Sequence, residues 1–278
     1  MNRDRFAARR AAFRKLHESG CFLIPNPWDA GSARALATLG FKALATTSSG
    51  YAWSKAKQDH APDVDAVLAH CREIVEATDL PINADFEDGH ASDIDGLTKN
   101  VRRCIDTGVA GLSIEDATGD PAQPLYAFAE AIARMRAARA AIDASGQDVL
   151  LVGRAECFLV GHPDALNESV RRLRAYADAG ADCLFAPGAS ETGQITVIVD
   201  AVTPKPVNVL VGRPTPYTLA DLARLGVRRV SVGGALAGAA WGGFLNAARE
   251  LAVGSFGGFA GNATHDQIDA LMRRRDDA

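Results

Sequence analysis

Short apolar runs recur along the whole chain, and stretches with apolar residues at helical spacing separate them. The runs are rich in β-branched residues or alternate with polar ones, as strands do. They predict eight strands, at Cys21–Pro25, Ala43–Thr47, Pro81–Asp85, Gly111–Glu115, Val149–Arg154, Asp182–Ala186, Pro206–Val211 and Arg229–Gly233. The intervening stretches predict helices at Ala30–Leu39, Val64–Ala77, Ile94–Thr107, Leu125–Ala144, Leu166–Ala179, Glu191–Ala201 and Leu219–Leu225. This alternation favours parallel βα units.

Glycine marks the ends of four predicted helices, directly before the next strand, at Gly40, Gly108, Gly180 and Gly226. Glycine ends helices readily because it adopts the left-handed backbone without a steric penalty. Eight βα units favour closure into a (β/α)8 TIM barrel. An open, doubly wound sheet is the alternative, but no GxGxxG motif follows the first strand.

The length of the chain suits a single domain. Its 278 residues fall in the range of one α/β barrel, so residues 1–278 are interpreted as one domain. Met1–Lys15 predicts a first helix. Residues 256–278 are interpreted as a C-terminal helical tail, with a last helix at Asp266–Arg275. The small-residue run Ala235–Gly243 predicts a helix that packs at a close interface.

Composition narrows the class of function. The formal net charge of −4 leaves no basic surface for a nucleic-acid backbone, and no apolar run is long enough to span a membrane. The five cysteines show no CxxC spacing, which argues against zinc and against a disulfide framework. A reduced, cytoplasmic protein is therefore expected.

Acidic residues follow two neighbouring predicted strands. Asp85 is the last residue of the third predicted strand, and Glu87 follows it by two residues. Glu115 is the last residue of the fourth predicted strand. In extended backbone, residues two apart point to the same side of the sheet, so we expect the three carboxylates to converge. Such a cluster repels itself unless a cation compensates, and oxygen ligands without Cys or His suit Mg²⁺, or Mn²⁺. The alternative, that acids at these turns cap helices, is assigned to Asp116 and Asp88.

Two further polar features have both a structural and a functional interpretation. Arg154 emerges from an apolar strand and needs an anionic partner. That partner is either Glu156 or Glu115 in a salt bridge, or a substrate carboxylate or phosphonate held in the guanidinium fork. Ser49-Gly50 offers a hydroxyl and backbone N–H groups to an anion, or forms an ordinary turn.

At these residues the chain resembles the isocitrate lyase/phosphoenolpyruvate mutase superfamily. The resemblance runs from Asn26-Pro-Trp-Asp29 to about Ala248. The metal-binding Asp-x-Asp of the family, with its Gly-rich turn, matches the segment from Asp85 to Ala91. Other family motifs match Glu115-Asp116, Arg154-Ala155-Glu156, Ser49-Gly50-Tyr51 and the loop acid Asp59.

The resemblance implies Mg²⁺ bound directly by Asp85, with Asp59, Glu87 and Glu115 acting mostly through water. It implies that Arg154, Asp59 and Glu115 are catalytic. The substrate site that it implies consists of Ser49, Gly50, Tyr51, Arg154, Asn208 and Trp28. It also implies a small carboxylate substrate and a last helix swapped between paired subunits of a homo-oligomer, as a dimer of dimers.

Two departures from the superfamily narrow the implied reaction. Its lyases carry a cysteine in the loop after strand four, but Ala117–Pro124 has none, and its mutases carry a histidine where this chain has Phe185–Gly188. We therefore expect a Mg-dependent decarboxylase or lyase that cleaves a C–C bond of a small 2-oxo or enol carboxylic acid through a metal-stabilised enolate. A P–C or phosphoenol-acid mutase or hydrolase and a non-catalytic carboxylate-binding member of the family are the alternatives.

Two other barrel functions fit the sequence less well. A Schiff-base aldolase needs a lysine in the barrel interior, but Lys42 and Lys205 precede strands and so lie at the opposite rim. A phosphate-binding barrel would use the Gly233-Gly234 turn after strand eight. We prefer to explain these glycines by the small-residue helix that follows them.

Overall fold

The computed structural model describes residues 3–273, and their side chains from Phe6 onward. All eight predicted strands form, as β1 (Phe22–Ile24), β2 (Leu44–Ala45), β3 (Ile82–Asp85), β4 (Gly111–Glu115), β5 (Leu150–Arg154), β6 (Cys183–Phe185), β7 (Val207–Leu210) and β8 (Arg229–Ser231). They pair in parallel in the order β1-β8-β7-β6-β5-β4-β3-β2. At the seam between β1 and β2, the amide of Ala45 donates to the carbonyl of Pro25 at 3.1 Å. The sheet is thus a nearly closed barrel, and the predicted (β/α)8 architecture is confirmed.

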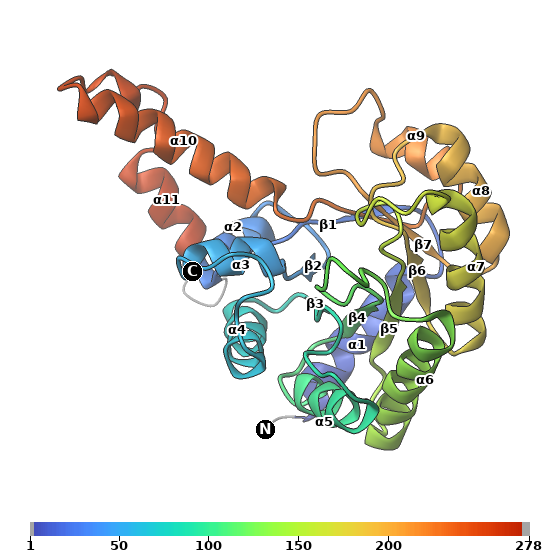
Figure 1. Ribbon diagram of the computed structural model, residues 1–278. Helices are drawn as coiled ribbons and strands as arrows, with labels where there is room; N and C mark the ends of the chain where they lie inside the picture. The colour runs from blue at the N-terminus through green and yellow to red at the C-terminus, as the bar shows by residue number, and fades with distance from the viewer. Residues whose placement is uncertain (1–2, 274–278) are drawn as a thin grey trace.

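Helices surround this barrel (Figure 1). The seven predicted between strands all form, as α2 (Ala30–Thr38), α4 (Val64–Ala77), α5 (Ile94–Ile105), α6 (Phe128–Ser145), α7 (Ala165–Asp178), α8 (Thr192–Val202) and α9 (Leu219–Arg224). The four predicted helix-ending glycines have φ angles of 89° (Gly40), 94° (Gly108), 100° (Gly180) and 85° (Gly226). This left-handed backbone turns the chain from helix into strand without the clash that a Cβ would cause.

A short helix that the sequence analysis missed, α3 (Ser48–Ser54), follows β2 directly. Thr47 is its N-cap, and the hydroxyl of Thr47 accepts from the amide of Gly50. The run of Thr, Ser and Gly here is typical of a turn, which concealed the helix. The consequence for the site is that the N-terminus of α3 points at the C-terminal end of β3.

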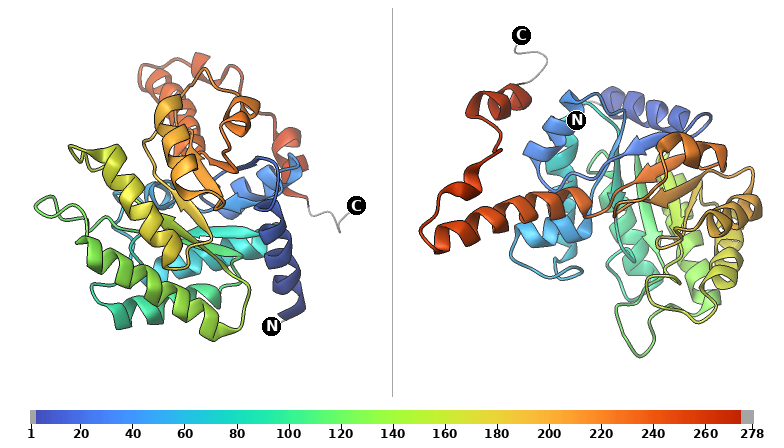
Figure 2. Two further views of the ribbon diagram at one scale, coloured as in Figure 1. Left: turned by 90° about the vertical axis from the view of Figure 1, so that its right-hand side faces the viewer. Right: turned by 90° about the horizontal axis from the view of Figure 1, so that it is seen from above.

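The first helix, α1 (Arg3–Leu16), fills the opposite, N-terminal end of the barrel. Its Phe13 is fully buried and packs with Ile24, Ala43 and Leu150. Arg10 fixes the helix there by donating to the carbonyl oxygen of Val109 at 3.0 Å. Both views of Figure 2 show α1 lying against the barrel. The barrel is therefore closed by side chains at this end and accessible at the other.

The C-terminal segment projects away from the barrel as an arm (Figures 1 and 2). It consists of α10 (Ala235–Ala252), the 3-10 turn η1 (Gly257–Phe259) and α11 (His265–Met272). Of α10, only Ala237 is buried, whereas α11 returns to α2, where Arg34 donates to the carbonyl of Met272 at 3.1 Å. Helix α11 lies within the segment predicted as a helical tail, whose last residues fall outside the described range, and the swap between subunits stays a prediction. No helix within residues 3–273 is long and apolar enough to cross a membrane.

The position of Phe13 makes the substitution Phe13→Ala a test of how much α1 stabilises the barrel. We expect it to lower the free energy of unfolding by about 3–5 kcal/mol, because it removes a buried ring and leaves a cavity. Urea denaturation measures this change. The control is Leu39→Ala, at a side chain 68% exposed, which should change stability by less than about 0.5 kcal/mol. Equal effects of the two substitutions would show that α1 does not seal the barrel.

Candidate active site

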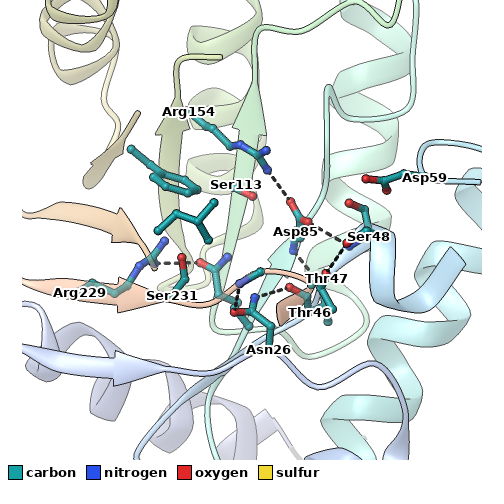
Figure 3. A pocket seen from close by; sticks show the side chains of 17 residues that line it. Asn26, Thr46, Thr47, Ser48, Asp59, Asp85, Ser113, Arg154, Arg229 and Ser231 are labelled. Atoms are coloured by element: carbon teal, nitrogen blue, oxygen red, sulfur yellow. Dashed lines mark hydrogen bonds and ion pairs between the residues drawn. The ribbon is translucent and has the colours of Figure 1, made fainter. Parts of the chain in front are cut away.

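A cavity of about 160 Å³ lies at the C-terminal ends of the strands. Hydroxyl and amide groups from the ends of β2, β3 and β8 and from α3 line it, together with four charged residues, Asp59, Asp85, Arg154 and Arg229 (Figure 3). Barrel enzymes bind their substrates at this end of the strands. The volume suits a small molecule, since one water occupies about 30 Å³ of liquid.

Asp85, the last residue of β3, is fixed from two sides. One carboxylate oxygen accepts from Nη1 of Arg154 at 3.1 Å, and the other accepts from the backbone amide of Ser48 at 3.1 Å. The backbone amide of Asp85 donates to the hydroxyl of Thr46 at 2.8 Å. The first turn of α3 thus orients this carboxylate.

Arg154 is the centre of a buried group of carboxylates from three strand ends. Its Nη1 lies 3.1 Å from an oxygen of Asp85 and 2.9 Å from one of Glu115, and its Nε donates to Glu156. The structural alternative, a salt bridge to Glu156 or Glu115, is therefore present, with both residues as partners. A role for the same guanidinium in holding a substrate carboxylate stays a prediction, and Arg154 does line the cavity.

One guanidinium does not neutralise this group. Burial raises the pKa of Glu115 well above its usual range, and the nearby carboxylates of Glu156, Asp85 and Glu87 raise it further, although Arg154 lowers it. Burial likewise raises the pKa of Glu156. These carboxylates outnumber the one guanidinium beside them, so their repulsion favours the protonated form of Glu115 unless another cation offsets it.

Glu87 does not lie where the extended-strand argument predicted. β3 ends at Asp85, and Glu87 has a left-handed φ of 47° in the turn beyond it. Its carboxylate lies 3.2 Å from Nδ1 of His60, a residue that the sequence analysis missed. The hydrogen bond to Glu87 raises the pKa of His60 to about 9. Ligand atoms of Asp59, His60 and Glu87 all lie within 4.8 Å of one another.

The four predicted metal ligands therefore form two adjoining groups. Asp85 and Glu115 share Arg154, whereas Asp59 and Glu87 lie with His60. The groups are joined by the backbone, because the amide of Glu115 donates to the carbonyl of Glu87 at 2.9 Å. A set of carboxylate oxygens that outnumber the nearby guanidinium fits a hard divalent cation. Convergence of all four residues on a single ion stays a prediction.

Asp116, expected to be a helix N-cap, instead joins three elements below the site. The N-cap of α6 is Ala127, and Asp116 is 2% exposed. Its carboxylate accepts from the hydroxyl of Tyr176 at 2.5 Å, from Arg172 at 3.0 Å and from the amide of Glu156 at 2.8 Å. Asp116 thus positions the segment after β5 that carries Glu156.

Asp88 does not cap a helix either, because the N-cap of α5 is Asp93. The carboxylate of Asp88 accepts from the hydroxyl of Tyr126 at 2.8 Å, and its carbonyl accepts from Arg134 at 2.7 Å. Arg134 is 1% exposed and stacks over Tyr126 at 4.1 Å. These contacts hold the turn after β3, and with it the backbone of Glu87.

Ser49, Gly50 and Tyr51, which were predicted to bind the substrate, lie in α3. Ser49 lines the cavity. The amide of Gly50 donates to the hydroxyl of Thr47 at 3.4 Å, and the amide of Tyr51 to its carbonyl at 3.1 Å. Of the three, only Ser49 lines this cavity, while Gly50 and Tyr51 hold the helix in place.

Trp28 and Asn208 lie outside the cavity lining. Trp28 packs under α3, where a Cβ on Gly50 would lie 3.0 Å from the Cβ of Trp28. Asn208 is 1% exposed; its side chain accepts from Nε of Arg229 at 2.8 Å and donates to the hydroxyl of Ser231 at 2.9 Å. Direct contact of either residue with a substrate stays a prediction.

Arg229 lines the cavity but was not among the predicted site residues. A signal for it was present in the sequence, because Arg229 is a charged residue at the start of a strand predicted to be buried on both faces. Charged side chains are almost never fully buried without a partner, so an arginine at such a position indicates a structural or functional role.

An eight-stranded parallel barrel with charged residues gathered at the C-terminal strand ends defines an enzyme of the α/β-barrel class. The chain belongs to the phosphoenolpyruvate phosphomutase family, whose model matches residues 13–252. This confirms the resemblance to the superfamily of isocitrate lyases and phosphoenolpyruvate mutases.

Individual relatives support the assignment. The chain is similar to a Burkholderia cenocepacia J2315 protein described as a lyase/mutase, with 44% identity, a TM-score of 0.94, and coverage of 99% of this chain and 100% of that one. It is 33% identical to an uncharacterised Mycobacterium tuberculosis protein over 80% of this chain and 81% of the relative. It is 30% identical to an oxaloacetate decarboxylase of Bradyrhizobium sp. strain BTAi1 over 82% of this chain and 78% of the relative.

The charge balance around Arg154 generates a prediction for Arg154→Met. In EDTA, this variant should be less stable than the wild type by about 3–5 kcal/mol, because two buried carboxylates, Glu115 and Glu156, and the partly buried Asp85 lose their counter-ion. Millimolar Mg²⁺ should restore part of the loss, which thermal denaturation with and without the ion measures.

Arg172→Met is the matched control, since Arg172 pairs with buried Asp116 away from the cavity. It should be destabilised as well, but without recovery in Mg²⁺. Recovery of both variants, or of neither, would contradict a cation site beside Arg154.

Proposed function

We propose that the protein is a Mg²⁺-dependent lyase that cleaves a C–C bond of a small 2-oxo carboxylic acid, in the manner of a decarboxylase. The observation that carries this proposal is the group of three carboxylates, Asp85, Glu115 and Glu156, around Arg154 beside a small polar cavity. The similarity to an oxaloacetate decarboxylase supports it.

The metal would be held by Asp85, Glu87, Glu115 and Asp59. When bound, Mg²⁺ polarises a substrate carbonyl and stabilises the negative charge that develops beside it. Mn²⁺ would serve the same chemistry, because carboxylate oxygens suit Mn²⁺ as well as Mg²⁺.

The residues of the chain would orient the acid around that charge. Arg154 would hold a substrate carboxylate, and the hydroxyls of Ser48 and Ser49 would donate to its oxygens. Asp59 and Glu115 are the proposed groups for moving a proton at the reacting carbon. The short loop Ala117–Pro124 is folded on itself through a bridge between Ala117 and Leu125, and it carries no cysteine. A decarboxylation does not depend on the acid that such a cysteine supplies.

The arm would assemble the enzyme into a homo-oligomer, as a dimer of dimers with the last helices exchanged. Its exposed aromatic side chains support this assembly, with Trp241 41% and Phe244 60% exposed.

We place the protein in the cytoplasm, because its five cysteines are free thiols, as expected in a reducing compartment.

Asp85→Ala tests the proposed function. Titration calorimetry should show Mg²⁺ binding weakened by at least about a hundredfold, and turnover of oxaloacetate should be lost. The control is Asp120→Ala, at an exposed acid of the loop after β4, which should change neither.

A screen of 2-oxo-dicarboxylates, malate-type acids and phosphonates, with EDTA as a blank, identifies the reaction. Turnover of a phosphonate alone would favour a mutase or hydrolase instead. Binding of carboxylates without turnover of any of them would favour a non-catalytic member of the family.

Trp241→Asp together with Phe244→Asp tests the assembly. Light scattering should show the double variant at a lower mass than the wild type, because two charges would enter an apolar interface. Val197→Asp, at an apolar side chain of α8 that is 45% exposed, should leave the mass unchanged. An unchanged mass of the double variant would remove the arm from the interface.

A further inference from the structure

Arg229 is a buried cation in the interior of the barrel. It begins β8, its residue is only 3% exposed, and it lines the same cavity as Arg154. Figure 3 shows it across the cavity from Asp85 and Asp59. Barrel interiors are normally filled by apolar side chains, so an arginine at this position requires an explanation.

The hydrogen bonds of Arg229 go to neutral groups. Its Nε donates to the side-chain oxygen of Asn208 at 2.8 Å, and its Nη1 donates to that of Asn83 at 3.4 Å. Among the residues that the structure describes, no carboxylate pairs with it and no acceptor takes a hydrogen bond from its Nη2. Arg154, on the other side of the cavity, has three carboxylate partners.

The surroundings confirm that this end of the cavity is positive. Burial lowers the pKa of Arg229, and among the described residues the thiol of Cys183 opposes this effect. Burial raises the pKa of that thiol, so Cys183 is neutral at physiological pH. Burial and then the charge of Arg229 hold the pKa of His17 at about 3, so this histidine is neutral as well.

The local structure holds the guanidinium in one place. Asn208 accepts from Arg229 and also donates to Ser231, and both are buried. A guanidinium in such a setting recognises a carboxylate or phosphate through paired N–H groups. An uncompensated buried cation destabilises a fold, and an anion that enters the cavity would compensate it.

We propose that Arg229 binds a second anionic group of the substrate, at the end of the cavity away from Asp85. The substrate would then be a dianion, of the 2-oxo-dicarboxylate class, and Arg229 would be the residue that selects it over a monocarboxylate of the same size. The identity of the substrate rests on the proposed function, whereas the binding of an anion at Arg229 does not.

The first test measures binding without metal or turnover. Titration calorimetry in EDTA, at constant ionic strength, compares succinate with its half-amide succinamate, which has the same shape and one charge fewer. The wild type should prefer succinate at least tenfold, and Arg229→Met should reduce the preference to threefold or less. Arg228→Met is the matched control, because Arg228 is the neighbouring arginine and donates outside the cavity to the carbonyl of Gly20. It should keep the wild-type preference.

Loss of the preference in both variants, its retention in Arg229→Met, or its absence from the wild type would each overturn the proposal. Should Arg229→Met fail to fold by circular dichroism, Arg229→Gln takes its place with the same expectation, and the wild-type comparison still decides. Arg229→Lys keeps the positive charge but lacks the paired N–H groups of a guanidinium, so it should recover part of the preference for succinate over succinamate.

The second test measures turnover with Mg²⁺. If the wild type decarboxylates oxaloacetate, kcat/KM for Arg229→Met should fall at least a hundredfold with Mg²⁺ affinity unchanged. If the wild type binds succinate with the expected preference but turns over no oxo acid, the proposed function fails and the role of Arg229 stands. If oxaloacetate is turned over equally by Arg229→Met and the wild type, the role of Arg229 fails and the proposed function stands.

Discussion

Mutual repulsion of carboxylates at the ends of β3, β4 and β5 is the constraint on which the rest of this site depends. Asp85, Glu115 and Glu156 approach one guanidinium so closely that burial and repulsion raise the pKa of Glu115. The surrounding structure opposes this repulsion through the amide of Ser48 at the start of α3 and through the backbone that Asp116 holds. A divalent cation would complete the balance, and it would do so at the point where a substrate oxygen can reach it.

The fold could be predicted from the sequence because its signals are local. Buried parallel strands are apolar throughout, and glycines such as Gly108 and Gly180 end helices where only a left-handed residue fits. Helix α3 was missed because Thr47-Ser48-Ser49-Gly50 has the composition of a turn, although Thr47 caps a helix there and Asp85 accepts from the amide of Ser48. The helices of the arm after β8 were predictable from its small residues and its tail pattern, whereas its projection away from the barrel has no local signal in the sequence.

The site was only partly predictable, since residue type and spacing do not fix the direction of a side chain once a strand has ended. The arrival of Asp85 and Glu115 at one guanidinium followed from the pairing of parallel strands. The argument failed at Glu87, where the backbone turns left-handed and directs the carboxylate to His60, a residue of a distant loop. Asp116 and Asp88 were taken for helix caps because an acid after a strand often is one, whereas their partners come from elements far along the chain.

The two guanidinium groups of the cavity differ in what they can bind, so a ligand would bind in one orientation rather than in either of two. Arg154 is already paired with carboxylates of the protein, so an anion that approaches it must share a cation with them and gains little without a metal. Arg229 offers N–H groups to an anion with only neutral amides as partners. A molecule with two anionic ends would therefore satisfy both ends of the cavity in one orientation, with one end beside the acidic group and the other in the barrel interior. Such a fixed orientation is what a reaction at one particular bond requires, because it places the oxo group, rather than the far carboxylate, where the cation belongs.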